Sequence, residues 1–434
     1  MTSLLISGGR IIDPCQGIDM IGDLLIVEGK VTWVGAPASA PSQRGYSVIP
    51  ARGMVVSPGF IDLHCHLRQP GFEEKETVAT GTRAAARGGF TTVCCMPNTH
   101  PPIDTAATVE YIKNKAIKEG VVQVFPIGCI TKGQRGEELV EMEGLAEAGV
   151  VAFSDDGKPV ANSQLMHRAL EYSRLCDLPI IDHCEDTSLT EGGVMNKGSL
   201  AVRLGLKGMT AAAEATIVDR DIALAQLAHA RLHIAHVSTA ASVELIRHAK
   251  ENHLNVTAEV TPHHLTLTEE RLISYDTNAK VNPPLRTEKD RETLLQGLGE
   301  GIMDAIATDH APHALQDKAC EFDLAAFGIS GLETALGVLL SLVHQGKLDL
   351  VTLVSKLTRE PARLLPFPQD LGTLKVGAPG DVTIFDPDLE WVVNPDLFAS
   401  KGKNSPWAGC PLKGKVMATV VGGEVVYKDD AIRF

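Results

Sequence analysis

Apolar runs and amphipathic segments alternate through the middle of the chain, and this alternation predicts strands followed by helices. The first clear case is the apolar run 54–63, followed by a helix-like segment at 74–87 and, after Gly88-Gly89, by the run 91–96. Glycine between a helix-like segment and β-branched residues is typical of a helix-to-strand transition. The same succession recurs and yields eight strand candidates: 54–63, 91–96, 121–127, 150–153, 179–181, 232–235, 255–259 and 302–307.

Most neighbouring strand candidates are separated by a helix-like segment. These segments cover 74–87, 108–118, 137–148, 164–176, 212–229, 242–251 and 289–298. Eight βα units predict a (β/α)8 barrel of the TIM type, an α/β fold with its active site at the carboxyl ends of the strands. An open doubly wound sheet is the alternative, but the chain has no G-x-G-x-x-G after an early strand and no G-x-x-x-x-G-K-[ST]. The nucleotide-binding versions of that sheet therefore lose support.

The two ends of the chain have a different pattern from the middle. Short β-like runs separated by glycine occupy 4–6, 23–27, 30–34, 381–385, 391–393, 416–421 and 424–428. They predict one small β-sandwich domain built from both termini. We therefore expect an amino-terminal part of this domain at 1–56, the catalytic barrel at 57–365 and a carboxyl-terminal part at 366–434.

Composition and charge narrow the class of protein. The chain is 44% hydrophobic and 22% charged, as is ordinary for a globular protein, and its 40 Lys and Arg against 54 Asp and Glu give a net charge of −14. Nucleic-acid partners are not expected, because phosphate contacts need clustered basic residues. No apolar run approaches the roughly 20 residues that span a bilayer, and residues 1–14 lack the features of a signal peptide. The nine cysteines are odd in number and contain no C-x-x-C, so a cytoplasmic protein without a disulfide framework is expected.

Histidine and aspartate residues follow the ends of several predicted strands. His64 and His66 share one face of the first strand, because alternate residues of a strand point the same way. The full set of candidate ligands is His64, His66, Asp156, His183, His236 and Asp309. Imidazole and carboxylate groups suit zinc and similar divalent metals. Six ligands are too many for one tetrahedral ion, so two zinc ions that share a carboxylate are favoured over one.

Several motifs resemble those of a known family. The run 58–66, Pro-Gly-Phe-Ile-Asp-Leu-His-Cys-His, resembles the opening motif of the amidohydrolase superfamily. The runs 66–71 (His-Leu-Arg-Gln-Pro-Gly), 96–99 (Met-Pro-Asn-Thr) and 309–313 (Asp-His-Ala-Pro-His) are similar to class I dihydroorotases, and the similarity covers nearly the whole chain. It implies a zinc enzyme of pyrimidine biosynthesis that reversibly cyclises N-carbamoyl-L-aspartate to L-dihydroorotate. Position 69 is Gln where the family usually has Glu.

The resemblance also implies how the ligands divide between the metals. In the family the first two histidines and the last aspartate hold one ion, the two middle histidines hold the other, and a carboxylate bridges them. Hydantoinases and some dihydroorotases use a carboxylated lysine as the bridge, but no lysine occupies the matching position after the fourth strand. By resemblance Asp156 takes this role, with Asp155 as the alternative and Lys158 as a loop residue.

Other residues near the predicted barrel mouth are suited to bind a substrate. Those expected to contact it are His66, Arg68, Asn98, Asn282, His313, Phe327 and Gly328. The Arg68 guanidinium is suited to hold a carboxylate with two hydrogen bonds, although an ion pair with Glu73 or Glu74 is the alternative. Asn98 and Asn282 are also common types of turn residue. Asp309 is expected to carry the catalytic proton in addition to binding metal.

Two other functions stay open at this point. One is another cyclic amidase, such as an allantoinase or a hydantoinase, and the other is a non-catalytic homologue that serves as a scaffold for another pyrimidine enzyme. Arg68, Asn98 and His313 together favour a substrate with a carboxylate, and the complete ligand set argues against a scaffold. The resemblance also admits a homodimer and an association with aspartate carbamoyltransferase, while no membrane partner is expected. His263 and His264 are motif-like but have no defined role.

Overall fold

Parallel strands close into a barrel in the middle of the chain. The computed structural model describes residues 3–37, 39, 46–366 and 371–431. The regular barrel strands are β6 (Phe60–Cys65), β7 (Phe90–Cys95), β8 (Gln123–Pro126), β9 (Ile180–Asp182), β12 (Leu232–Ile234), β13 (Val256–Val260) and β14 (Ala305–Ile306). The run 150–153 supplies the fourth position as an extended segment, and Phe153 forms parallel bridges with Gly128 and Ile180. A bridge between Cys65 and His310 closes the circle, so the predicted eight-position barrel is confirmed.

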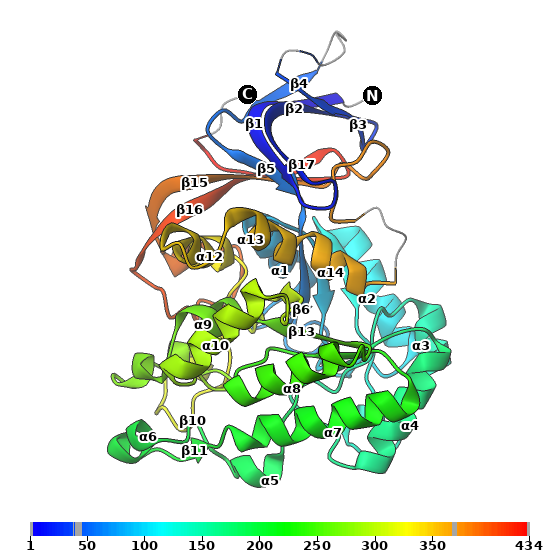
Figure 1. Ribbon diagram of the computed structural model, residues 1–434, viewed down its shortest axis with the longest axis vertical. Helices are drawn as coiled ribbons and strands as arrows, with labels where there is room; N and C mark the ends of the chain where they lie inside the picture. Colours follow the sequence, from blue (N-terminus) through cyan, green and yellow to red (C-terminus); the bar gives the residue numbers. More distant parts are fainter. Residues whose placement is uncertain (1–2, 38, 40–45, 367–370, 432–434) are drawn as a thin grey trace.

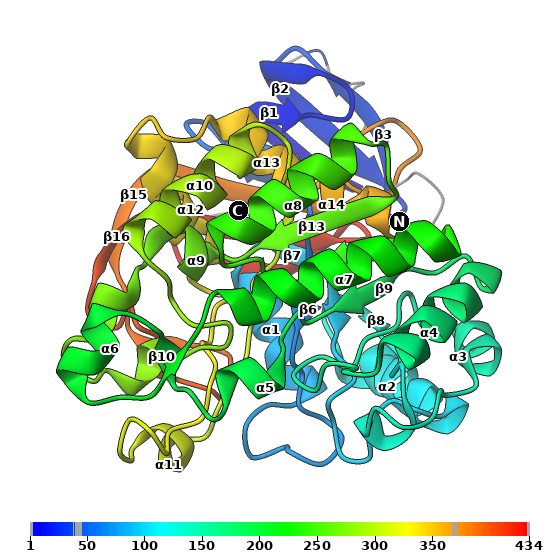
Figure 2. The same cartoon turned by 60° about the horizontal axis from the view of Figure 1, so that its bottom comes forward.

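Helices between the strands cover the outside of the barrel (Figures 1 and 2). They are α1 (Val78–Arg87), α2 (Ala106–Glu119), α3 (Met142–Ala148), α4 (Ser163–Leu175), α7 (Ala212–Ala228), α8 (Ala240–Glu251) and α10 (Glu288–Gly299). Several begin at a side-chain cap: Thr77 forms a capping box on α1, and the Asn162 side chain accepts hydrogen bonds from two backbone N–H groups of α4. These caps satisfy N–H groups that a helix start leaves unpaired, so polar residues in the sequence determine where the helices begin.

Apolar side chains fill the barrel, and further elements surround its two ends. Inward residues such as Leu63, Cys94, Ile127 and Ile181 form one buried cluster. Between the barrel and the terminal sheet lie α12 (Ala335–His344), α13 (Leu350–Leu357) and α14 (Arg359–Leu364) (Figure 1). The remaining short elements are η1 (Lys132–Gln134), α5 (Thr187–Thr190), β10 (Met195–Asn196), α6 (Ser199–Leu204), β11 (Gly208–Met209), α9 (Pro262–Thr266), η2 (Glu269–Leu272), η3 (Thr277–Ala279), α11 (Leu315–Lys318) and η4 (Pro395–Leu397). Of these, α5, α6 and α11 lie at the end of the molecule opposite β1 and β2 (Figure 2).

Strands from both chain ends form one further sheet. Its order is β17-β16-β15-β5-β1-β2-β3, and β4 pairs with β1. The strands are β1 (Ser3–Asp13), β2 (Ile18–Val27), β3 (Lys30–Gly35), β4 (Ser47–Pro50), β5 (Val55–Pro58), β15 (Val382–Val392), β16 (Pro411–Val421) and β17 (Glu424–Lys428). The sheet has its own apolar cluster, with Ile6 and Leu24 from one end of the chain and Ile384 and Val420 from the other. The β-rich part predicted from both termini is therefore present as one continuous sheet.

The strand predicted at 54–63 divides between the two parts of the protein. Residues Val55–Pro58 form β5 of the terminal sheet, and Phe60–Cys65 form β6 of the barrel. A side chain on Gly59, between them, would place its Cβ 2.1 Å from Thr91 Oγ1, so glycine is needed where the chain crosses. The predicted domain boundary at 56–57 falls within β5, and the three-part division stays a prediction.

Two further sequence expectations concern membranes and disulfides. No helix among the described residues combines the length and apolar character that crossing a membrane requires. All nine cysteines lie in the described ranges and are free thiols, as the irregular spacing predicted.

Candidate metal centre and substrate pocket

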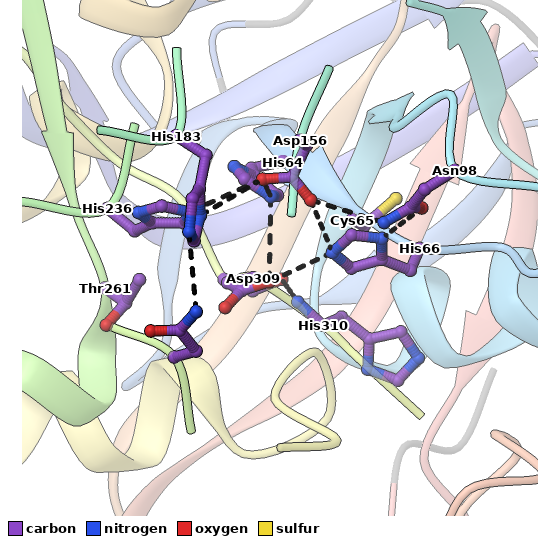
Figure 3. A network of polar contacts seen from close by, with 12 residues as sticks. His64, Cys65, His66, Asn98, Asp156, His183, His236, Thr261, Asp309 and His310 are labelled. Atoms are coloured by element: carbon purple, nitrogen blue, oxygen red, sulfur yellow. Dashed lines mark hydrogen bonds and ion pairs between the residues drawn. The ribbon is translucent and has the colours of Figure 1, made fainter. Parts of the chain in front are cut away.

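The six candidate metal ligands converge at the carboxyl ends of the barrel strands (Figure 3). His64 and His66 come from the end of β6, His183 follows β9, and His236 follows β12. All six side chains, including Asp156 and Asp309, belong to residues that are at most 5% exposed. Two groups have ligand atoms within 4.8 Å of one another: His64 with Asp156 and His236, and His64 with His66 and Asp309.

Asp156 lies at the centre of the cluster. Its Oδ1 is 3.5 Å from His64 Nε2, 3.5 Å from His236 Nε2 and 3.7 Å from His183 Nδ1. Its Oδ2 is 3.6 Å from His66 Nε2. Burial opposes ionisation, but the nearby imidazole rings of His64 and His236 outweigh it and lower the pKa of Asp156 well below its usual value. This carboxylate is thus charged and faces all four histidines.

Unpaired polar atoms show that a cation fits the cluster. Within the described ranges, His64 Nε2 and Asp156 Oδ1 are buried and have no hydrogen-bond partner. A buried polar atom left unpaired costs about 1–3 kcal/mol, so such atoms usually bind a ligand or ion. His183 Nδ1 and His236 Nε2 are 3.0 Å apart, close to the ~3.3 Å that separates two nitrogens on a tetrahedral zinc with bonds of about 2.0–2.1 Å. His66 Nε2 and Asp309 Oδ1, at 3.2 Å, are similarly spaced.

Three of these histidines use one ring nitrogen to face Asp156 or Asp309. A second layer of polar side chains binds the opposite ring nitrogen of each. The pairs are His64 Nδ1 with Glu259 Oε1 at 2.9 Å, His66 Nδ1 with Asn98 Oδ1 at 2.9 Å, and His183 Nε2 with Glu185 Oε2 at 3.0 Å. Such partners fix the tautomer and orientation of a metal-binding histidine. In each ring they leave the nitrogen that faces Asp156 or Asp309 available to a metal.

Glu259 and Glu185 are functional candidates that the sequence reasoning missed. Burial would raise the pKa of Glu259, but hydrogen bonds from His233 and His64 lower it to about 2. Glu185 has a pKa of about 2 because the hydrogen bond from His183 outweighs its partial burial, and its Oε2 also accepts from Asn282 Nδ2 at 2.8 Å. The signal for Glu185 was its position two residues after His183, whereas nothing near Glu259 in the sequence points to His64.

The two aspartates considered for the bridge lie in different surroundings. Asp155 Oδ1 accepts hydrogen bonds from the backbone N–H groups of Ile130 at 2.9 Å and Thr131 at 3.2 Å. Burial raises the pKa of Asp155 to about 6. Asp155 thus fastens a neighbouring loop while Asp156 faces the histidines, which favours Asp156 as the shared ligand. Lys158 is exposed.

A pocket of about 240 Å³ opens beside the ligand cluster. Its lining includes all seven residues expected to contact the substrate, His66, Arg68, Asn98, Asn282, His313, Phe327 and Gly328. The rest of the lining is Asp156, Gly157, His183, His236, Asp309 and Ala311. The pocket therefore brings together cationic, amide and imidazole groups around the candidate metal centre. Asn98 also contacts the ligand layer, because its Nδ2 donates to Asp156 Oδ2 at 3.4 Å.

Arg68 and His313 form the basic side of this pocket. Arg68 Nε donates to the Pro312 carbonyl oxygen at 3.2 Å, and its Nη2 lies 3.5 Å from His313 Nε2. The alternative partner Glu73 instead accepts a hydrogen bond from the backbone N–H of Gly71. Burial, with the nearby Arg68 cation, lowers the pKa of His313 to about 3, so this ring is neutral. Its Nε2 donates to the Phe327 carbonyl oxygen at 2.7 Å.

Three residues of the site have unusual backbone angles. Arg68, His236 and Asp309 have φ of 60°, 31° and 45°. Positive φ is uncommon outside glycine and concentrates at functional sites, where the surrounding structure holds it. No local sequence pattern predicts these angles.

His263 and His264, which had no defined role, are both buried. His264 Nδ1 is 2.8 Å from Thr261 Oγ1 and its Nε2 is 3.0 Å from the carbonyl oxygen of Pro283, directly after Asn282. His264 therefore holds the loop that carries a pocket residue. The His263 ring contacts the His264 ring at a centroid distance of 4.5 Å.

Comparisons with known proteins agree with this geometry. The profile of the dihydro-orotase-like family matches residues 53–242, and that of an amidohydrolase family matches residues 342–427. The chain is 54% identical to the dihydroorotase of Citrifermentans bemidjiense over 98% of its own length and 100% of that protein. It is 53% identical to the dihydroorotase of Pelotomaculum thermopropionicum over 99% of its length and 100% of the relative.

Solved structures with a similar fold include hydantoinases and dihydropyrimidinases. The L-hydantoinase (dihydropyrimidinase) from Arthrobacter aurescens has a TM-score of 0.90 and 26% identity, covering 100% of this chain and 98% of that one. The dihydropyrimidinase from Brevibacillus agri has a TM-score of 0.86 at 23% identity, covering 99% and 96% of the two chains. The second similarity concerns the fold alone.

Proposed function

The chain belongs to the dihydroorotase family of amidohydrolases, and from this premise we propose that its barrel mouth interconverts N-carbamoyl-L-aspartate and L-dihydroorotate at a metal centre. The observation that carries the proposal is the adjacency of two kinds of group. Four histidines and two aspartates, among which His64 and Asp156 each have an unpaired buried atom, lie beside a pocket lined by Arg68 and His313. The first kind suits metal-assisted hydrolysis, and the second suits a substrate with a carboxylate.

The residues divide the chemical work between binding and proton transfer. A bound divalent metal supplies Lewis-acid polarisation of the ring amide carbonyl and lowers the pKa of water. Asp309 Oδ1 faces His66 Nε2 at 3.2 Å, which leaves its second oxygen to accept the proton of the attacking water. Asp309 then gives this proton to the ring nitrogen as the carbon–nitrogen bond breaks. The products are a carboxylate and a ureido group, and ring closure runs the same steps in reverse.

The pocket residues orient the substrate during these steps. Arg68 is suited to bind the substrate carboxylate with a charge-assisted pair of hydrogen bonds. The Asn282 amide and the free Nδ1 acceptor of neutral His313 offer further polar groups to the ring. Holding the ring amide against the reacting water in this way lowers the entropic part of the barrier.

Purified protein tests the proposal directly. Hydrolysis of dihydroorotate is measured with native protein, with chelator-treated protein and after zinc is restored. Dihydrouracil, hydantoin and allantoin, which lack the carboxylate, are compared at the same concentrations. We expect metal-dependent turnover of dihydroorotate that exceeds that of the other rings. Faster turnover of hydantoin or allantoin would favour the other cyclic amidases, and no turnover of any ring would favour the scaffold alternative.

We further propose that the metal is zinc, with two ions per chain. The proposal also includes a cytoplasmic location and the protein partners named below. The two ligand groups lie side by side, with His64 in common, and support two neighbouring ions, for which Asp156 would be the shared carboxylate. Elemental analysis of protein purified without chelator gives the metal and its number. A homodimer and an association with aspartate carbamoyltransferase rest on family resemblance alone, and light scattering with and without that enzyme tests both.

A further inference from the structure

A segment of the carboxyl-terminal part reaches the substrate pocket. Asn404 lies between β15 and β16, in a stretch that leaves the terminal sheet, and it is only 3% exposed. Its Nδ2 donates to the carbonyl oxygens of Ala311 at 3.1 Å and Gly328 at 3.0 Å. Its Oδ1 accepts from the backbone N–H of His313 at 3.0 Å and from Ser330 Oγ at 2.8 Å. The amide thus uses both of its donors and both acceptor positions.

These four bonds join two loops that form one wall of the pocket. Ala311 and His313 belong to the loop after β14, and Gly328 belongs to the loop after α11. All three line the pocket. The backbone carbonyl of Asn404 also accepts the N–H of Ser330 at 2.9 Å. Because every one of these contacts is buried, separating the loops would leave several polar groups unpaired.

The segment itself is fixed against the barrel. A Cβ on Gly402 would lie 2.4 Å from the Pro312 side chain, so the backbone approaches the first loop as closely as glycine allows. Lys403 Nζ donates to the carbonyl oxygens of Phe398 and Ser400, each at 2.8 Å. Glu333 accepts the N–H of Ser400 at 3.1 Å. The stretch that leads into Asn404 is therefore fixed in place.

The two loops that Asn404 joins, here called the clamped loops, orient the basic side of the pocket. Arg68 Nε donates to the carbonyl oxygen of Pro312, between Ala311 and His313, so the first loop also orients the guanidinium. His313 Nε2 in turn donates to the Phe327 carbonyl at the start of the second loop. The relative position of the two loops consequently sets where Arg68 and His313 point.

We propose that Asn404 is a positioning residue that sets the geometry of Arg68 and His313 and so determines affinity for a substrate carboxylate. The inference rests on the proposed function for the identity of the substrate. Asn404 touches none of the candidate metal ligands through the four side-chain contacts described. Its loss should therefore change substrate binding and leave metal content unchanged.

Asn404→Asp is the informative substitution, because it keeps the size and the acceptor but replaces the donating NH2 with an oxygen that faces two carbonyls. We expect kcat/KM for dihydroorotate to fall by about tenfold to a hundredfold, mainly through KM, since the clamp acts on a group remote from the reacting amide. Asn394→Asp is the matched control. It changes an exposed asparagine of the same segment that caps the Asp396 N–H, and it should behave as wild type.

Two further measurements separate positioning from a general structural role. In an Arg68→Met background, Asn404→Asp should cost less than in the wild type, because coupled residues are not additive. Ser330→Ala removes one clamp bond and should raise KM by a smaller factor, and it decides the matter if Asn404→Asp does not fold. Unchanged KM in the folded variants, or a loss confined to kcat with full additivity, would overturn the inference.

Hydrogen exchange distinguishes failure of this inference from failure of the proposed function. In Asn404→Asp the backbone amides of Ala311, His313 and residues 328–330 should exchange faster than in Asn394→Asp, whatever the substrate. If the wild type does not turn over dihydroorotate but exchange increases, the proposed function is wrong and the clamp stands. If the wild type is active and neither KM nor exchange changes, the clamp is wrong and the function stands.

Discussion

Replacing Glu259 with Gln should weaken zinc binding without touching a ligand. The two oxygens of Glu259 accept from two rings at once, at 2.9 Å from His64 Nδ1 and 3.1 Å from His233 Nε2. Glutamine has one acceptor oxygen and an NH2 that can only donate. In Glu259→Gln one of the two rings must face this NH2. If it is His64, the ring is pushed toward the tautomer whose Nε2 carries the proton and cannot bind metal.

The size of the effect follows from the hydrogen bond that is lost. A bond to a charged group is worth about 1.5–3 kcal/mol, or roughly ten- to a hundredfold in an equilibrium constant. In other proteins, replacing the hydrogen-bond partner of a metal-binding histidine lowers metal affinity by about 10–100-fold. Glu259 is fully buried and charged, with a pKa lowered to about 2 by its two histidines despite the burial, so water does not replace it. We therefore expect Glu259→Gln to lower the affinity for the ion nearest His64 by about ten- to a hundredfold.

Competition with a chromophoric chelator at fixed pH measures the affinity, and thermal unfolding of the metal-free proteins measures stability separately. His233→Gln is the control, because its amide still offers a donor to the far oxygen of Glu259 while the bond to His64 is kept. It should change zinc affinity by no more than a few-fold. Wild-type affinity in Glu259→Gln, with the metal-free protein folded, would refute the reasoning.

Three other outcomes are expected. Arg68→Met should lower kcat/KM for dihydroorotate by about ten- to a hundredfold with full metal content, and loss of zinc in this variant would instead make Arg68 part of the metal site. Asp309→Asn should keep the fold and lose at least about 10²-fold in kcat. Zinc is measured in the same sample because Asp309 is also a ligand candidate, and near-normal kcat with full metal would exclude Asp309 from proton transfer. Ring closure consumes one proton, so the equilibrium ratio of dihydroorotate to carbamoyl aspartate should fall by about tenfold for each unit by which the pH is raised near neutrality. A pH-independent ratio, measured from both directions, would contradict the proposed reaction.

Local patterns predicted the barrel strands to within a few residues where each strand is an uninterrupted buried run. The predicted run 232–235 is β12 (Leu232–Ile234), and 255–259 is β13 (Val256–Val260). The run 54–63 was wrong as a single strand, because the break at Gly59 depends on Thr91, which is brought close only by the tertiary fold. Periodicity records which residues are buried but not which of two sheets buries them.

The same distinction between local and distant contacts applies to the site. The six ligand candidates were predictable because each follows a strand end, and strand ends share one face of a barrel. Glu259 and Asn404 were missed because their partners are far away in the sequence: 195 residues separate Glu259 from His64, and 91 separate Asn404 from His313. Their roles depend on side chains that meet only after the barrel has closed.

Closure of the barrel and assembly of the metal centre are parts of one structural event. At the seam, the N–H of His66 donates to the carbonyl oxygen of His310 at 2.8 Å, and the N–H of Thr308 donates to Asp62 Oδ1 at 2.8 Å. Asp309 lies between these two attachment points, so its approach to His66 requires the seam. A cation that binds both residues therefore favours the closed barrel by mass action, and opening the seam must release it.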